Sequence, residues 1–80
     1  MADKVLAKVL SGQSDRSLRY DELAALLRRL GFTERSGRGS HRIFDHPAVA
    51  KSVTLVQKRG NVSAYHVRDV REAILEADNG

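Results

Sequence analysis

The chain has no cysteine and no tryptophan, and it contains one proline among its 80 residues. Without cysteine it can form neither a disulfide nor a thiolate metal site, so packing must stabilise it and a reducing compartment is expected. Its apolar stretches are short and interrupted by charge, which predicts neither a signal peptide nor a membrane span. A chain of this length builds one small core. We therefore expect a single cytoplasmic domain over residues 1–80, without a small-molecule cofactor and without membrane attachment.

Positive charge is concentrated in one part of the chain. Residues 16–42 contain seven arginines and three acids, and the remainder is neutral, for a net charge of +4. A local basic field attracts polyanions, and arginine suits bidentate contacts with phosphate. The C-terminal end of a helix accounts for Arg28 and Arg29. It does not account for Arg35, Arg38 and Arg42, which favour a nucleic-acid partner.

Apolar residues recur at helical spacing in three segments. The first predicts a short amphipathic helix at about residues 3–10. A leucine stripe over residues 23–30 predicts a second helix, with Asp21 as its N-cap or as an acid in its first turn. Gly31 stands where a left-handed C′ residue would end that helix in a Schellman-type closure. The third segment predicts a C-terminal helix over about residues 64–77.

Three short runs between the second and third helices have strand character. They cover residues 32–36, 40–45 and 52–57 and predict a three-stranded antiparallel meander. The order α-α-β-β-β-α is typical of an α+β two-layer sandwich, with helices covering one face of the sheet.

The strand pattern leaves apolar residues without an assigned partner. Ile43 and Phe44 are adjacent, so they point to opposite faces of the sheet, and Val56 alternates with Leu55 in the same way. A partly apolar strip is therefore expected on the open face. Either a protein partner binds this strip, or the sheet twists enough for the N-terminal helix to cover it.

The first predicted hairpin contains the segment that points most directly to a function. Gly37 and Gly39 flank Arg38, where they allow positive φ and the close approach of a ligand, and His41 follows at the start of a strand. Arginine offers charge to phosphate, and imidazole exchanges protons near neutral pH. This combination suggests chemistry on nucleic acid. The alternative is an ordinary surface hairpin with a solvated histidine.

Other chemistries fit the sequence poorly. His41 and His46 are five residues apart, which would place them on opposite faces of a continuous strand, and His66 lies on the polar side of a helix, so no metal site is expected. Ser40 points away from His41 and cannot form a nucleophile–base pair with it. What remains is metal-free acid–base chemistry on RNA, in which the ribose 2′-hydroxyl attacks the neighbouring phosphate. A second acid–base group is required, and the sequence leaves its identity open.

A family resemblance adds to this interpretation. Residues 26–32 read LLRRLGF and residues 37–47 read GRGSHRIFDHP, followed by a VTLV strand, a basic loop and a last helix. This succession resembles the HicA toxin family of bacterial toxin–antitoxin systems over about residues 19–77. Its most specific part is the pattern LGF … GSH-x-IF-x-HP.

The resemblance implies a double-stranded-RNA-binding-like fold, cleavage of messenger RNA, a catalytic histidine at His41 and neutralisation by a HicB-type antitoxin. The extra N-terminal helix and the basic loop before the last helix depart from the family pattern. A non-catalytic RNA-binding or protein-interaction domain on the same fold is the alternative function. The residues predicted to contact RNA or to shape the loop that does so are Arg35, Gly37, Arg38, Gly39, Ser40, Arg42, Lys58 and Arg59.

Overall fold

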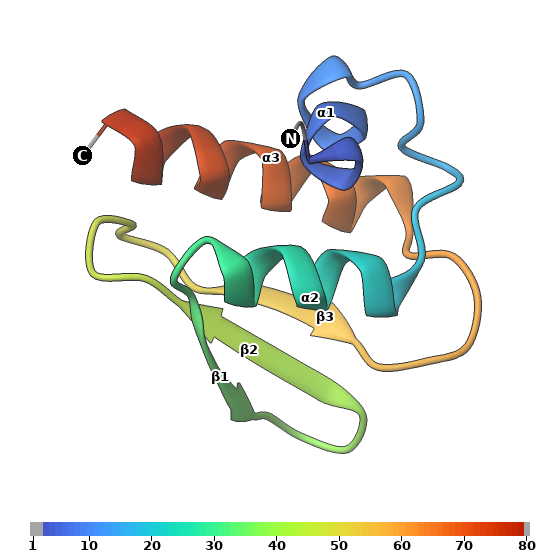
Figure 1. The fold of residues 1–80 in the computed structure, drawn as a ribbon. Helices are drawn as coiled ribbons and strands as arrows, with labels where there is room; N and C mark the ends of the chain where they lie inside the picture. Colours follow the sequence, from blue (N-terminus) through green and yellow to red (C-terminus); the bar gives the residue numbers. More distant parts are fainter. Residues whose placement is uncertain (1–2, 80) are drawn as a thin grey trace.

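The computed structural model describes residues 3–79 and contains three helices and three strands (Figure 1). In chain order they are α1 (Lys4–Ser11), α2 (Tyr20–Arg29), β1 (Thr33–Ser36), β2 (His41–Asp45), β3 (Val53–Val56) and α3 (Ala64–Asn79). The predicted α+β class and the order α-α-β-β-β-α are confirmed. No helix within residues 3–79 has both the length and the hydrophobicity that crossing a membrane requires.

The strands form an antiparallel sheet in the order β1-β2-β3, and helices lie on one of its faces. Helix α2 packs beside β1 and α3 packs beside β3. The side chains of Phe44, Val53 and Leu55 point toward the helices and are buried. Those of Ile43 and Val56 point the other way and are half-buried. The predicted alternation is confirmed, and it leaves an open face without a helix.

The turn after α2 fixes where the sheet begins. Gly31 takes a φ of 93°, and its N–H donates to the carbonyl of Arg28 at 3.1 Å. The N–H of Phe32 donates to the carbonyl of Leu27 at 3.0 Å. These two bonds are the Schellman motif that the sequence predicts. At the other end of α2, Asp21 is an acid of the first turn, because Arg19 occupies the N-cap position.

The N-terminal segment packs on the helical side of the molecule. Helix α1 contacts α2 and α3 (Figure 1), so it does not cover the open face of the sheet, and that alternative is wrong. The carboxylate of Asp3 caps α1 and pairs with Arg29 at 3.0 Å. The hydrogen bond from the backbone N–H of Leu6 is the largest influence on the pKa of Asp3; with the help of the Arg29 guanidinium it holds this pKa below its usual 3.8, although desolvation raises it.

Candidate functional site

His41 is the first residue of β2, and the preceding turn orients its ring. The ring Nδ1 lies 2.8 Å from the carbonyl oxygen of Arg38, and the backbone N–H of His41 donates to the same oxygen at 2.9 Å. A carbonyl oxygen only accepts hydrogen bonds, so this contact assigns the proton to Nδ1. In the neutral ring, Nε2 then carries the lone pair. Because the side chain is exposed, that nitrogen is available to a ligand.

Gly37 lies directly across from His41 in the hairpin. Its N–H donates to the carbonyl of His41 at 2.8 Å. A Cβ at Gly37 would stand 3.2 Å from the Cβ of His41 and 3.2 Å from the Cδ1 of Ile43. The expectation of positive φ is correct for Gly39, whose φ is 55°, and wrong for Gly37. Close packing against His41 and Ile43 leaves little room for a side chain at Gly37, whereas Gly39 supplies the turn conformation.

Three exposed cations lie around this turn at one end of the sheet. Arg38 is in the turn itself, and Lys58 and Arg59 are in the loop that follows β3 (Figure 1). The N–H of Gln57 donates to the carbonyl of Ser40 at 2.7 Å and joins the two loops. Among the ion pairs found within residues 3–79, none involves these three cations. Their charge is therefore available to an anion.

Arg42 follows His41 in sequence but projects to the opposite face of the sheet. Its Nε donates to the Oε1 of Gln57 at 2.9 Å, and its Nη1 donates to the Oγ of Ser36 at 2.8 Å. A carboxylate oxygen of Glu34 lies 3.9 Å from its Nε. Arg42 thus links β1, β2 and the start of the loop after β3. The sequence analysis did not single out Gln57. Its backbone N–H bonds to Ser40 in the turn before β2, and its side chain accepts from Arg42 in β2, so it connects the loop after β3 to both.

Arg35 lies on the open face, as His41 does, but it is engaged with an acid. Its Nε donates to the Oδ2 of Asp45 at 2.7 Å. This hydrogen bond, followed by the one from Ser52, holds the pKa of Asp45 below its usual 3.8. The structure therefore places His41 at the end of the sheet where the loops that carry Arg38, Lys58 and Arg59 meet. It places Arg35 nearer the centre of the sheet and Arg42 on the reverse side.

The other two histidines are separated from His41. His46 follows the far end of β2, roughly 16 Å away at the usual rise per strand residue. Its Nδ1 accepts the N–H of Ala48 at 3.0 Å, and its ring packs on Phe32. His66 lies in α3 beside Tyr65. Within the part of the chain that the structure describes, no three His, Cys, Asp or Glu side chains gather as metal ligands would.

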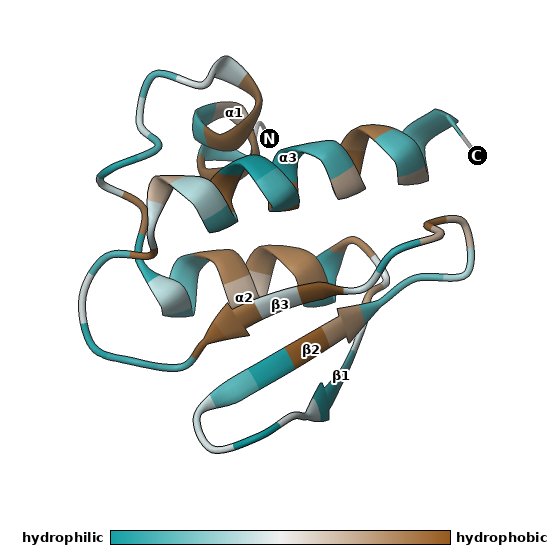
Figure 2. Cartoon of the chain, turned by 180° about the vertical axis from the view of Figure 1, so that it is seen from behind, coloured by the Kyte–Doolittle hydropathy of each residue, from teal (hydrophilic) through white to brown (hydrophobic). Residues whose placement is uncertain are grey.

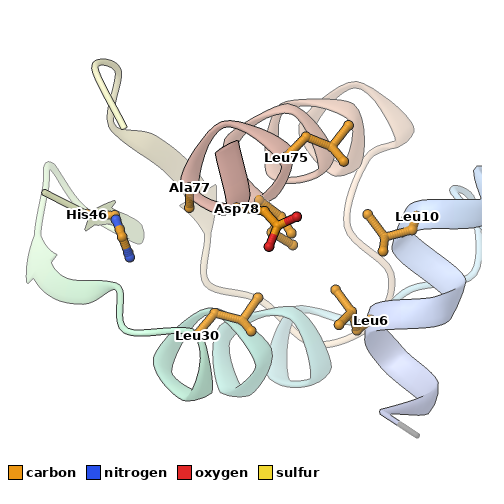
Figure 3. A pocket seen from close by; sticks show the side chains of 8 residues that line it. Leu6, Leu10, Leu30, His46, Leu75, Ala77 and Asp78 are labelled. Atoms are coloured by element: carbon orange, nitrogen blue, oxygen red, sulfur yellow. The ribbon is translucent and has the colours of Figure 1, made fainter. Parts of the chain in front are cut away.

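A groove of about 390 Å³ opens between α1, the end of α2 and α3 (Figure 3). Its walls are mainly apolar, and its polar side chains are His46 and Asp78. The sequence did not predict this groove, because four segments far apart in the chain form it. It lies on the helical side of the molecule, away from the open face that carries His41. The apolar residues that line it are Leu6, Leu10, Leu30, Ile74, Leu75 and Ala77.

Comparison with known protein families gives a match that covers most of the chain. The family model described as the HicA toxin of bacterial toxin-antitoxin matches residues 20–76, which is more than half of the chain. The matched region begins with α2 and includes the His41 turn and all three strands, while α1 precedes it. No curated protein and no solved structure gives a significant match. The chain therefore belongs to the HicA toxin family of bacterial toxin–antitoxin systems.

Proposed function

We propose that this toxin is an endoribonuclease that cleaves messenger RNA without a metal ion, with His41 as the proton-transfer residue. The observation that carries the proposal is the anchored imidazole. Its Nδ1 lies 2.8 Å from the carbonyl oxygen of Arg38, and its exposed side chain is at the end of the sheet where the loops that carry Arg38, Lys58 and Arg59 meet. A base held in one tautomer beside cations suits proton transfer at a phosphodiester.

The chemistry needs few groups from the protein. Nε2 of His41 accepts the proton of a ribose 2′-hydroxyl as its oxygen attacks the adjacent phosphorus. The bond from phosphorus to the 5′-oxygen of the next nucleotide breaks, and that oxygen takes up a proton from water at this exposed site. The products are a 2′,3′-cyclic phosphate and a free 5′-hydroxyl. Arg38 and Lys58 stabilise the negative charge that develops on phosphate. DNA lacks the 2′-hydroxyl and is not cleaved.

The remaining predicted contacts take different roles in this proposal. Arg59 adds a phosphate contact beside Lys58. Arg42 is a positioning residue, because it bonds to Ser36 and Gln57 on the reverse side of the sheet. The guanidinium of Arg35 is bonded to Asp45, so Arg35 contacts a phosphate only if its guanidinium binds the phosphate and Asp45 at the same time.

The test is cleavage of single-stranded RNA by the purified protein in EDTA, with single-stranded DNA as a second substrate. We expect cleavage of RNA alone, and His41→Ala should lower the rate by about 10²–10⁴-fold. His66→Ala is the matched control, since it removes a histidine from α3 and should leave the rate unchanged. In cells, expression should arrest growth, and His41→Ala should relieve the arrest. Activity that requires added magnesium would contradict the mechanism.

A non-catalytic RNA-binding domain is the second candidate, and one observation favours it. The open-face neighbours of His41 across the sheet are Gly37 and Val56, and Ile43 is next along β2. Gly37 has no side chain, and the aliphatic side chains of Val56 and Ile43 cannot supply the second proton-transfer group. If this candidate is correct, the protein binds RNA without cleaving it, and His41→Ala still arrests growth.

Membership of a toxin–antitoxin family implies an antitoxin partner. We propose that a HicB-type antitoxin covers the open face of the sheet. Ile43 and Val56 are half-buried apolar residues on the face that also carries His41. A protein that binds there would bury His41 without reacting with it.

A further inference from the structure

Two segments that are far apart in sequence lie side by side next to the His41 turn. The N–H of Val62 donates to the carbonyl of Leu18 at 2.7 Å, and the N–H of Tyr20 donates to the carbonyl of Gly60 at 3.3 Å. The side-chain amide of Asn61 donates to the carbonyl of Arg16 at 3.0 Å. The connection between α1 and α2 is thereby fixed onto the loop between β3 and α3. Figure 1 shows both segments at the same end of the molecule.

These two segments carry positive charge and almost no negative charge to neutralise it. Residues 16–20 and 57–61 contain four cations and no acid. The cations are Arg16, Arg19, Lys58 and Arg59, here called the basic strip, and all four are exposed. Figure 2 shows the loop after β3 as mainly hydrophilic.

The acids nearest to the strip in sequence do little to neutralise it. Asp21 lies 3.5 Å from Arg19, but both side chains are more than half exposed, so their attraction is weak. Asp15 precedes Arg16 and is already bound by Arg71 from α3. The four cations therefore repel one another at a site that the backbone holds in place, and a polyanion would relieve that repulsion.

The basic strip is continuous with the turn that carries His41. Val56 pairs with His41 across the sheet, and the next residue, Gln57, bonds to the carbonyl of Ser40. Lys58 and Arg59 follow directly, and Gly60 and Asn61 contact the segment that contains Arg16 and Arg19. A path of positive charge thus runs from Arg38 beside His41, around the end of the sheet, to the start of α2.

We propose that the basic strip binds the phosphates of RNA that flank the nucleotide held at His41, and that Arg16 and Arg19 are phosphate contacts of this chain. The proposal rests on the proposed function for the identity of the ligand. Both arginines precede residue 20, the first residue matched by the family model. The segment before the matched region therefore extends the surface that is available to the RNA. As a result, longer RNA binds more tightly.

The test uses 2′-O-methyl RNA, which has no free 2′-hydroxyl and is not cleaved, so that affinity can be measured with the active protein. The double variant Arg16→Gln/Arg19→Gln should flatten the dependence of log affinity on log salt, by about 0.7 for each phosphate that the protein no longer neutralises. The decrease in affinity should be large for an oligonucleotide of about 16 nucleotides and small for one of about 4. Lys4→Gln/Lys8→Gln removes the same charge from exposed positions of α1 and should bind as the parent does.

A second variant separates charge from folding. Arg16→Lys/Arg19→Lys keeps both charges and should restore the parental slope; a flattened slope with lysine would contradict the proposal. Equal slopes for the glutamine variant and the α1 control would overturn it. So would a glutamine variant that binds RNA normally but no longer binds the antitoxin, because the strip would then be a protein-binding surface. If the cleavage mechanism is wrong, the result is different. Unmodified RNA would then remain uncleaved, while the salt dependence of binding to 2′-O-methyl RNA would still depend on Arg16 and Arg19.

Discussion

The carbonyl oxygen of Arg38 accepts hydrogen bonds from both the backbone N–H and the ring Nδ1 of His41, three residues later. One turn therefore sets both the start of β2 and the orientation of the imidazole. Any change that moves this turn also moves the ring. The activity proposed for His41 should be sensitive to substitutions that leave the imidazole itself intact.

Gly37→Ala is the first such substitution. The added Cβ would lie 3.2 Å from the Cβ of His41 and 3.3 Å from its carbonyl oxygen, so the imidazole must shift by a few tenths of an ångström. We expect slower RNA cleavage from a folded protein, measured as the initial rate alongside the urea midpoint. Gly12→Ala is the control, because Gly12 also takes a positive φ, of 74°, but ends α1 away from His41, and its added Cβ would lie 3.5 Å from the Arg71 side chain, at ordinary contact distance. Its positive φ costs about 1 kcal/mol of stability. An equal loss of activity in the two variants would argue against steric positioning of His41.

Arg71→Met should release the N-terminal segment from α3. Arg71 donates to the carbonyl of Val9 at 2.7 Å and to the carboxylate of Asp15 at 2.6 Å. The Arg71 and Asp15 side chains are 21% and 17% exposed, so removing the guanidinium leaves partly buried acceptors unsatisfied. We expect a loss of about 1–3 kcal/mol, with hydrogen exchange accelerating in α1 more than in α2.

Arg68→Met, one turn earlier in α3, is the control for this experiment. Its guanidinium is on an exposed residue and lies 5.9 Å from the Tyr65 ring centroid. It should change the urea midpoint little. If exchange in α1 were as slow in Arg71→Met as in the parent, other contacts would be holding the N-terminal segment.

The fold followed from local patterns more completely than the site did. The Gly31 turn was predictable because its requirement for a left-handed residue is contained within one helix end. Strand alternation did not decide which of Ile43 and Phe44 is buried, but their opposite orientations were predictable from it. The role of Gly37 was not, because a close approach across a hairpin is not encoded in the conformational preference of glycine.

Contacts between segments that are far apart in the chain could not be predicted from the sequence. Arg42 was grouped with His41 by sequence proximity, although neighbouring strand residues face opposite sides and Arg42 bonds to Gln57. Arg16 and Arg19 belong to the basic third of the chain, but no local signal places them beside Lys58. Their position depends on backbone bonds between residues 18 and 62 and between residues 20 and 60.

The Arg35–Asp45 pair should contribute to stability in a pH-dependent way. Hydrogen bonds from Arg35 and then Ser52 hold the pKa of Asp45 below 3.8 in the folded protein. The folded state thus favours the charged carboxylate, and the contribution is complete above the unfolded-state pKa. It is lost as the pH falls below about 4. Asp45→Asn should lower the urea midpoint at pH 6 and give a curve that converges with the parent in acid. Arg35→Gln should do the same, whereas parallel curves would mean that the pair does not stabilise the fold.

The last prediction concerns the antitoxin. Ile43 and Val56 lie on the open face beside His41, and Val56 pairs directly with His41, so a new charge at position 56 would also disturb the surroundings of His41. Ile43→Lys is the better test, because it adds a long cation to the apolar strip and keeps the surface that we propose binds RNA positive. We expect it to weaken the complex with a HicB-type antitoxin, measured by calorimetry, while RNA cleavage continues.

Leu75→Lys is the matched control for Ile43→Lys, since Leu75 is 47% exposed in the helical groove (Figure 3) and lies away from the open face. It should bind the antitoxin as the parent does. Val56→Thr keeps the β-branched shape of the strand residue, so this variant should remain folded. It should weaken the complex less than Ile43→Lys does. If Leu75→Lys abolishes the complex and Ile43→Lys does not, the antitoxin binds the groove between the helices. It would then have to inhibit the toxin without covering His41.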